Sequence, residues 1–527
     1  MPVSPTYPGV YIEELPSAVR AIVGVSTSVT AFIGRARRGP VDEPVRVHGF
    51  GEFARVFGGL WREAPMGYSV DHFFRNGGSE AIIVRVAASD AAPATVSLPA
   101  GAGTLPLQAS SPGAWGNRLR ALVDHDVEGD SSVFNLTLQE MDRVFVSGTD
   151  TPQNQPRPVQ EEVFRNVSSN PASARYVAKV LEEQSSLANV PEGATVPAAR
   201  PDPLEDPTAP NTLANFSGAF QNGADGAAIG EAQVNGSEAA KTGIHALLKT
   251  DIFNILCIPP FAAEQDVTAN TWGIAAKFCE DHRAMLVIDP PASWTNTAQA
   301  ESGVASDVGA ASKNAAVYFP RVRIADPEQD FQLETFVPCG VVAGVMARTD
   351  ATRGVWKAPA GIDATLGGVQ QVSVPLSDGD NGVLNKLGIN CLRSFPVYGR
   401  VAWGARTRRG SDRMADQWKY VPVRRTALYI EESLFRGLKW AVFEPNDEPL
   451  WSQIRLNVGA FMHGLFRQGA FQGSKPKDAY LVKCDSETTT QDDINKGIVN
   501  VLVGFAPLKP AEFVILKIQQ LAGQVAA

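Results

Sequence analysis

The sequence predicts a mixed α/β protein whose α/β core is interrupted by an inserted β-rich domain and flanked by a strand at each terminus. Three observations predict this class. Short apolar strands alternate with helical patterns before and after a long middle stretch. Ala, Pro, Gly, Ser and Thr dominate much of that stretch, a loop-rich composition typical of a surface insertion. Each end of the chain carries a strand pattern beside prolines.

These changes in composition divide the chain into six predicted segments. The chain has 527 residues, enough for about three or four domains. The segments are an N-terminal arm (1–21), a first core part (22–88), the β-rich insertion (89–243), a second α/β block (244–350), a C-terminal domain (351–506) and a C-terminal arm (507–527).

Composition excludes several classes of function. An apolar content of 44% with 20% charged residues is that of an ordinary globular chain. The net charge of -9 argues against nucleic acid as a direct partner, because such proteins normally carry a basic excess. The five cysteines are scattered without CxxC spacing, so neither a zinc site nor a disulfide framework is indicated. We expect no metal and no cofactor.

The sequence also shows no recognisable targeting or membrane-spanning segment. The first residues lack the basic and apolar regions of a secretory signal. The longest run of apolar or small residues, 339–347, is too short to cross a bilayer. We therefore expect reduced thiols in a protein made in a cytosol, with no membrane span.

The N-terminal arm contains a short predicted strand at residues 9–14. Val10 and Ile12 alternate with Tyr11 and Glu13, and nearby prolines disfavour a helix. The first core part then has β-rich or apolar runs at 25–34, 44–48 and 81–86 and helical patterns at 50–57 and 68–75.

A nucleotide-binding fingerprint occurs in this first core part. Residues 49–54 match the G-x-G-x-x-A pattern after a strand and before a helix. Phe50 and Phe53 put bulk where a pyrophosphate would lie, and Asp71 falls inside the second helix and not at the end of a strand. These departures from the fingerprint favour a protein without catalytic activity over an enzyme that binds a nucleotide at this turn.

The insertion is predicted to be a β-rich surface domain in which long loops separate the strands. We expect strands at 118–123 and 133–138 and a helix at 170–186. The loops are 89–111, 151–158 and 189–210. No charged constellation that could support catalysis stands out among them.

The second α/β block is predicted to contain a parallel crossover unit. A strand at 252–258, a helix at 271–283 and a strand at 285–289 follow one another at the right spacing. Asp289 ends the second strand, where α/β enzymes place functional carboxylates. Residues 280–283 combine acids, His and Arg, but helical spacing distributes them around the helix. A further strand (315–324) and a helix (341–349) complete the block.

The C-terminal domain alternates strands and helices. Residues 378–382 resemble the start of a calcium loop, but its twelfth position would be Ile389 instead of Glu. Asn446 or Asp447 is expected to cap a long helix that ends near Arg467. The other expected elements are a turn plus strand at 385–393 and at 401–406, an extended segment at 440–443, strands at 480–483 and 498–505, and helices at 424–436 and 490–496.

The C-terminal arm is predicted to be a strand with apolar residues on both faces. Residues 511–520 follow a Pro-Leu-Lys-Pro linker that no helix crosses. The apolar side chains are those of Phe513, Val514, Ile515, Leu516 and Ile518. Such a strand promotes aggregation unless something pairs with it. It either folds back on its own body or completes a sheet in another copy of the chain.

Motifs along the whole chain resemble those of the contractile tail sheath family of phages, R-type bacteriocins and related injection systems. They occur in family order from one end to the other, and the insertion is the part that matches least. They are YPGVYIEE (7–14), GVSTS (24–28), AFIG (31–34), FFRNGG (73–78), PGAWGN (112–117), GVWKAPAG (354–361), GINCLR (388–393), WGART (403–407), VPVRR (421–425), FEPNDEPLW (443–451) and FAPLKPAEF (505–513).

The resemblance implies a structural polymer and not an enzyme. Sheath subunits stack as hexameric rings around an inner tube, and exchanged terminal arms join neighbours in a shared β-sheet. The sheath, assembled in the bacterial cytoplasm, contracts after a baseplate signal and drives the tube through a target envelope without consuming a nucleotide. Implied partners are further copies of the chain, the inner tube, the baseplate and a terminator or cap.

The resemblance also implies site residues. The arm strands would be residues 10–12 and 513–518, and a helix of the C-terminal domain would face the tube. For the helix at 447–467, Arg455 and Arg467 are candidates for contacts with tube carboxylates, or for ion pairs within the subunit. A sheath-like cap that shares the fold without polymerising remains an alternative.

Overall fold

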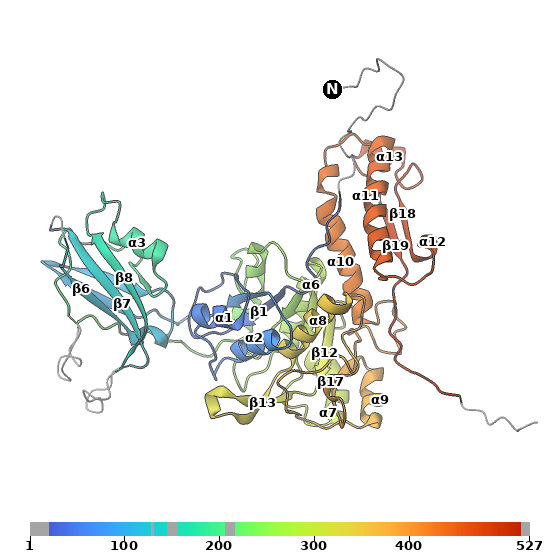
Figure 1. Cartoon of the computed structure of the whole chain (residues 1–527), viewed down its shortest axis with the longest axis horizontal. Coiled ribbons are helices and arrows are strands. Elements are labelled where there is room, and N and C mark those ends of the chain that lie inside the picture. The colour runs from blue at the N-terminus through green and yellow to red at the C-terminus, as the bar shows by residue number, and fades with distance from the viewer. Residues whose placement is uncertain (1–20, 128–130, 145–155, 206–216, 518–527) are drawn as a thin grey trace, which may run out of the picture.

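The computed structural model describes residues 21–127, 131–144, 156–205 and 217–517. Figure 1 shows three bodies along the long axis of the molecule: a β-rich body with β6–β8, a central sheet covered by helices, and a C-terminal body with α10 and α11. Val10, Tyr11 and Ile12 of the predicted N-terminal strand, and Ile518 of the C-terminal strand, lie outside the described residues.

The central sheet has eight strands in the order β17-β16-β12-β11-β10-β1-β3-β2. Its inner strands run parallel, and the edge strands β2 and β17 pair antiparallel with their neighbours. The predicted crossover is confirmed, since β10 and β11 are parallel neighbours joined by α6. The strands are β1 (Thr30–Gly34), β2 (Val45–Val47), β3 (Ala81–Arg85), β10 (Ile255–Cys257), β11 (Met285–Ile288), β12 (Ala315–Phe319), β16 (Ile389–Phe395) and β17 (Gly399–Ala402).

Helices bury both faces of this sheet, which explains why its central strands are apolar without alternation. In β1, Phe32 belongs to one hydrophobic cluster and Ile33 to the other, on opposite faces. The helices around the sheet are α1 (Phe50–Phe57), α2 (Pro65–Arg75), α5 (Glu231–Asn235), α6 (Ala269–Asp281), α7 (Thr297–Gly303), α8 (Cys339–Arg353) and α9 (Asp378–Lys386).

A smaller three-stranded sheet borders the central one. The predicted continuous strand 315–324 is wrong: β12 ends at Phe319, and β13 begins a different sheet at Val322. Pro320 lies between them and has no backbone N–H to continue a ladder. The strands of this sheet are β13 (Val322–Asp326), β14 (Gln332–Phe336) and β15 (Gln371–Val372).

The β-rich body has its own hydrophobic cluster and two three-stranded sheets. The loop prediction for residues 89–111 is wrong, because they form the β4–β5 hairpin. Leu98 and Leu107 on that hairpin are fully buried. The elements are β4 (Thr95–Ala100), β5 (Gly103–Ala109), β6 (Leu119–Asp124), β7 (Val133–Met141), β8 (Pro158–Ser168), β9 (Ala188–Asn189) and α3 (Val177–Gln184).

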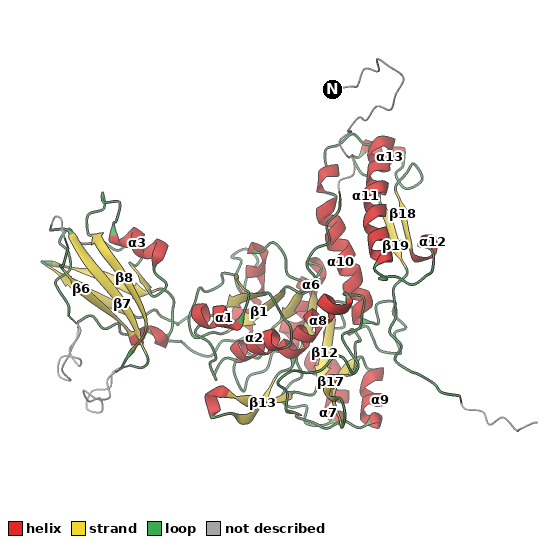
Figure 2. Ribbon diagram, viewed as in Figure 1, coloured by secondary structure: helices red, strands yellow, loops and turns green. Residues whose placement is uncertain are grey.

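In the C-terminal body the long helix α11 lies between α10 and a two-stranded sheet, and all three share one hydrophobic cluster (Figure 2). Asp447 caps α11 as predicted, accepting from the Leu450 amide at 3.5 Å. The extended segment predicted at 440–443 is wrong, since residues 439–441 form a 3-10 turn. The elements are α10 (Val421–Gly437), α11 (Glu448–Arg467), α12 (Pro476–Ala479), α13 (Gln491–Asn495), β18 (Tyr480–Lys483) and β19 (Leu502–Phe505).

Candidate assembly site

The chain leaves the C-terminal body after β19 as an extended segment (Figure 1). Phe513, Val514, Ile515 and Leu516 are 73%, 81%, 80% and 81% exposed. Residues 511–517 belong to no strand, and no backbone hydrogen bond joins them to another described residue. Four consecutive apolar side chains therefore face solvent, and their backbone groups are available for pairing.

An arginine of the body holds the start of this segment. The Arg406 Nε donates to Oε1 of Glu512 at 2.7 Å, and Nη2 donates to Oε2 at 2.5 Å. The Tyr420 hydroxyl donates to the same Oε2 at 3.2 Å. This two-pronged contact fixes both position and orientation of the Glu512 carboxylate, as bidentate guanidinium–carboxylate pairs do.

The Arg406 side chain is fully buried. Its Nη1 donates to the carbonyl oxygens of Asn385 at 2.7 Å and Gly410 at 3.3 Å, and to Asp412 at 3.0 Å. Burial by itself would lower the pKa of Arg406, but the hydrogen bonds and negative charge of Glu512 outweigh it, and the pKa is raised. The guanidinium is therefore charged at every physiological pH.

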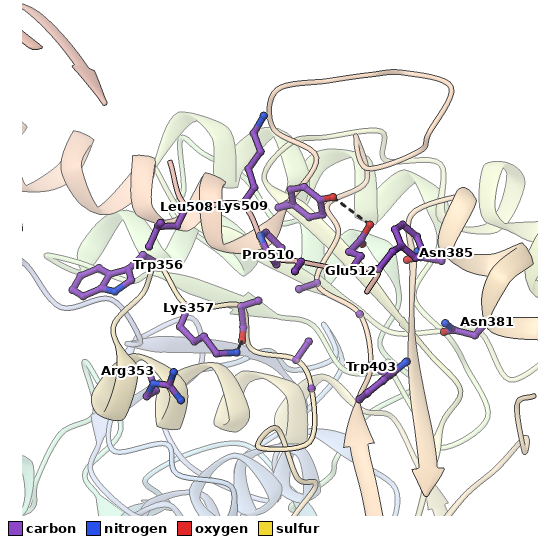
Figure 3. Close-up of a pocket in the computed structure, with 18 of the residues that line it drawn as sticks. Arg353, Trp356, Lys357, Asn381, Asn385, Trp403, Leu508, Lys509, Pro510 and Glu512 are labelled. Atoms are coloured by element: carbon purple, nitrogen blue, oxygen red, sulfur yellow. Dashed lines mark hydrogen bonds between the residues drawn. The ribbon is translucent and has the colours of Figure 1, made fainter. Parts of the chain in front are cut away.

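A cavity of about 640 Å³ lies between the arm and the body. Figure 3 shows Leu508, Lys509, Pro510 and Glu512 of the arm along it, with the dashed Tyr420–Glu512 hydrogen bond. Body residues lining it include Arg353, Trp356, Lys357, Asn381, Asn385 and Trp403. The arm thus touches the body at a few points and is not packed flat on it.

The β18–β19 hairpin is a second open structure in the same body. Its two strands pair only with each other among the described residues. Val482 and Val503 face the hydrophobic cluster, whereas Leu481 and Leu502 on the other face are 53% and 52% exposed. A two-stranded sheet is marginal by itself, and both of its edges could accept a further strand.

The chain that follows the N-terminal arm runs along α10. Arg425 donates from Nη2 to the Thr27 carbonyl at 2.8 Å and forms a buried pair with Asp350 at 2.6 Å. The Val25 amide donates to Ser433 Oγ at 3.2 Å. These contacts attach residues 25–27 to the C-terminal body.

The two candidate tube-facing arginines have different surroundings on α11. Arg455 donates to Glu448 at 2.5 Å and to the Cys484 carbonyl, so it already has partners within the subunit. Arg467 is exposed and forms no ion pair with another described residue.

The nucleotide fingerprint does not form a phosphate cradle. Gly49 precedes α1 in extended conformation, and Phe53 two residues after Gly51 is fully buried. Asp71 lies on α2 and receives a hydrogen bond from Arg75 at 3.0 Å. Phe53 thus serves the core, and Asp71 is a buried carboxylate that pairs with Arg75 on the same helix.

Asp289 lies at the carboxyl end of the sheet, as the sequence predicts, but it is buried beneath the first turn of α8. Its Oδ1 accepts from the Cys339 amide at 2.8 Å, and its Oδ2 has no partner among the described residues. Burial raises the pKa of Asp289 to about 7. The carboxyl group holds the start of α8 and does not line the cavity beside the C-terminal arm or the one beside α2 and β14.

Residues 280–283 do not converge on one site. Glu280 accepts from Ser312 at 2.5 Å, whereas Arg283 donates to Glu432 on α10 at 2.5 Å. Across the described ranges, no group of three or more His, Cys, Asp or Glu side chains could hold a metal ion. No helix in those ranges is long and apolar enough to cross a membrane.

The Arg406–Glu512–Tyr420 contact was not predicted from the sequence. Arg406 and Glu512 both lie within quoted motifs, WGART and FAPLKPAEF, which was the available signal. Nothing in a single sequence says that two charged residues 106 positions apart meet. Their contact depends on the path of the chain through the C-terminal body.

Comparisons with known proteins point to one family. Residues 414–520 match the phage tail sheath C-terminal domain. The tail sheath protein of Vibrio phage KVP40 is 25% identical over 178 residues, which cover 34% of this chain and 25% of that protein. The tail sheath protein of Burkholderia phage BcepMu is 28% identical over 253 residues, which cover 45% and 50%. The chain thus aligns with half or less of the length of these relatives.

The structural likeness covers much more of the chain. The contracted sheath of the extracellular contractile injection system PVC has a TM-score of 0.57 at 22% identity, over 98% of each chain. The matched proteins are structural sheath proteins and not enzymes, in agreement with the expectation from the sequence motifs. The resemblance to the contractile tail sheath family is therefore confirmed, by the sheath C-terminal domain at residues 414–520 and by the sheath fold over nearly the whole chain.

Proposed function

We propose that this chain is the structural subunit of a contractile sheath. Subunits would form stacked hexameric rings around an inner tube, and their contraction would drive the tube through a target envelope. The observation that carries the proposal is the exposed, unpaired apolar segment 513–516 on a body with the sheath fold. Such a segment is suited to pairing with another copy of the chain.

The energetics favour donation of this segment over exposure to solvent. Burying an apolar side chain of this size contributes about 1.5–3 kcal/mol. Four such side chains can therefore stabilise each subunit contact by several kcal/mol, before the cost of ordering the arm. The β18–β19 hairpin supplies a matching acceptor, since it has open edges and an apolar exposed face.

The arm and hairpin also indicate how subunits stay joined during contraction. Backbone pairing between an arm and a neighbour's hairpin does not depend on the orientation of the remaining bodies. The prolines at 507 and 510 give the tether a restricted conformation between body and strand. The rigid bodies can then rotate while arms remain paired, with the driving energy stored in subunit packing and no nucleotide consumed.

Further partners follow from this role. The inner tube, a baseplate and a terminator or cap protein would contact the sheath, which would assemble in the bacterial cytoplasm before use. We place α11 on the tube side, with Arg467 and Arg455 directed at acidic groups of the tube. The exposure of Arg467 and its lack of a described ion-pair partner support this placement more strongly than the surroundings of Arg455 do.

The test is deletion of the chain after Pro510. The variant should remain folded and soluble, because the hydrogen bonds lost from the described residues are those of Glu512, and Arg406 keeps Asp412 and two carbonyl oxygens as acceptors, but it should form no tubes. Negative-stain electron microscopy of the full chain and the variant, with thermal unfolding as a check on folding, measures both properties. Long striated tubes from the truncated chain would contradict strand donation, and single rings from the full chain would indicate a sheath-like cap.

A further inference from the structure

We infer that helix α10 anchors both terminal arms. A charged clamp at its N-cap, formed by Tyr420 and the adjoining Arg406, holds the C-terminal arm, and a close-packed groove along its C-terminal half holds the N-terminal segment. The inference rests on the proposed function, because it concerns where the arms leave a polymerising subunit. A helix of 17 residues is about 26 Å long. One rigid element would then set the distance between the two points of departure.

The clamp operates at the start of α10. Tyr420 is the N-cap residue of the helix, and its hydroxyl donates to Glu512. Arg406 contributes the other two hydrogen bonds to Glu512 and is itself fixed by the Asn385 and Gly410 carbonyls. The Glu512 side chain is 17% exposed, less than its exposed neighbours Ala511 and Phe513, and no described residue after Glu512 hydrogen-bonds to the body. The free part of the arm therefore begins at a defined point.

The groove operates at the other end of α10. Gly437 is the last residue of the helix, and a Cβ there would lie 2.7 Å from a methyl carbon of Ile22. A Cβ on Gly24 would lie 1.9 Å from the hydroxyl of Tyr429. Because both residues are glycines and have no side chain, the N-terminal segment can approach the helix closely. Ile22 is buried there, whereas the adjacent Val23 is 78% exposed.

Between its ends, α10 is tied to the central α/β body. Arg424 donates to Asn314 at 2.8 Å, Glu432 pairs with Arg283, and Arg425 pairs with Asp350. The helix thus connects the core to the positions at which both arms leave the subunit. When the core rotates, the positions at which the two arms leave the subunit should move together at a constant separation. The spacing between the arms that join neighbouring subunits is then kept.

The clamp is tested with Glu512→Gln, which keeps the shape of the side chain and removes its charge. Asp412→Asn is the matched control, because it removes a carboxylate from the same guanidinium without touching the arm. Spin labels are placed at Val397→Cys and Val514→Cys in the unassembled fraction of the full chain, where the five native cysteines are buried. Pulsed electron spin resonance then gives the distribution of distances between body and arm.

We expect a narrow distribution in the parent and in Asp412→Asn, and a distribution at least twice as broad in Glu512→Gln. In unlabelled proteins, Glu512→Gln should also lower the yield of tubes about tenfold, in a chain that thermal unfolding shows to be folded at the temperature of assembly. An unchanged distribution in Glu512→Gln, equal broadening in Asp412→Asn, or broadening without loss of tubes would overturn the clamp. A parent that forms no tubes but shows the expected distances would contradict the proposed function and not the clamp.

The groove is tested with Gly437→Leu against Gly459→Leu, a helical glycine on α11 whose added Cβ would meet nothing within 4 Å. A spin label at Val23→Cys reports the N-terminal segment against a label at Val397→Cys. Gly437→Leu should broaden this distance distribution and lower the yield of tubes, and Gly459→Leu should leave the distribution unchanged. A displaced helix would change the Val514–Val397 distances as well, so broadening confined to position 23 supports the groove. An unchanged distribution in Gly437→Leu would overturn it.

Discussion

Buried charged side chains join parts of this chain that lie far apart in the sequence. Arg85, at the end of β3, donates to the carbonyls of Ala36, Gly39 and Pro112, and the last of these leads into the β-rich body. Burial lowers the pKa of Arg85 to about 10, so the side chain is still charged near neutral pH. Arg406 acts in the same way on the C-terminal arm. In each case several oxygen acceptors compensate for the loss of water.

Asp289 gives a prediction at the scale of one residue. Its pKa of about 7, compared with an ordinary value of 3.8, means that the folded chain binds a proton that the unfolded chain releases. This contribution to stability is present at low pH and is lost as pH rises from about 4 through 7. The difference corresponds to about 4 kcal/mol. Asp289→Asn should therefore be the more stable protein at pH 8, with the advantage shrinking toward pH 5.

Denaturant unfolding of both proteins between pH 5 and pH 8 measures this difference. Subtracting the two curves removes the titration of groups that the variant retains, including His72, whose burial lowers its pKa to about 3. Parallel curves, with no change in the difference between pH 5 and pH 8, would show that Asp289 is ionised in the folded chain.

At the scale of elements, helices and strands with regular apolar periodicity were predicted correctly, whereas strands rich in small residues were not. Helix α1 and strand β18 have the predicted bounds, because apolar spacing and flanking signals agreed there. The β4–β5 hairpin was missed, since Ala, Gly, Pro and Thr obscured the alternation of its buried residues. The assembly site was predictable in part. The apolar pattern of residues 513–516 was readable, but the Arg406–Glu512 contact depends on long-range folding.

Helix α11 gives a prediction at this scale. Arg467→Glu should weaken binding to the inner tube through charge repulsion, while polymers formed without a tube should be unaffected. Arg455→Glu should weaken it less, because that arginine already pairs with Glu448. Each exposed charge contributes roughly 1 kcal/mol or less, so a several-fold loss of binding is expected. Co-sedimentation with tubes measures it, with the exposed Lys277→Glu on α6 as control. Equal binding by all variants would place another surface against the tube.

At the scale of the whole molecule, separate hydrophobic clusters stabilise the separate bodies. The central sheet has a cluster on each face, and the β-rich body and the C-terminal body each have their own. Because each cluster is formed by described residues of one chain, the bodies are suited to act as rigid units in the proposed contraction. The exposed apolar residues 513–516 of the C-terminal arm belong to none of these clusters, and they form a run of four consecutive exposed apolar side chains.

A helical reconstruction of the polymer by electron cryomicroscopy tests the central claim most directly, because it shows the path of residues 513–517. The account predicts that these residues continue as a strand beside the β18–β19 hairpin of another copy, with Glu512 still bound to Arg406 of its own subunit. Density that places residues 513–517 against their own body, or a purified chain that forms no polymer, would contradict it.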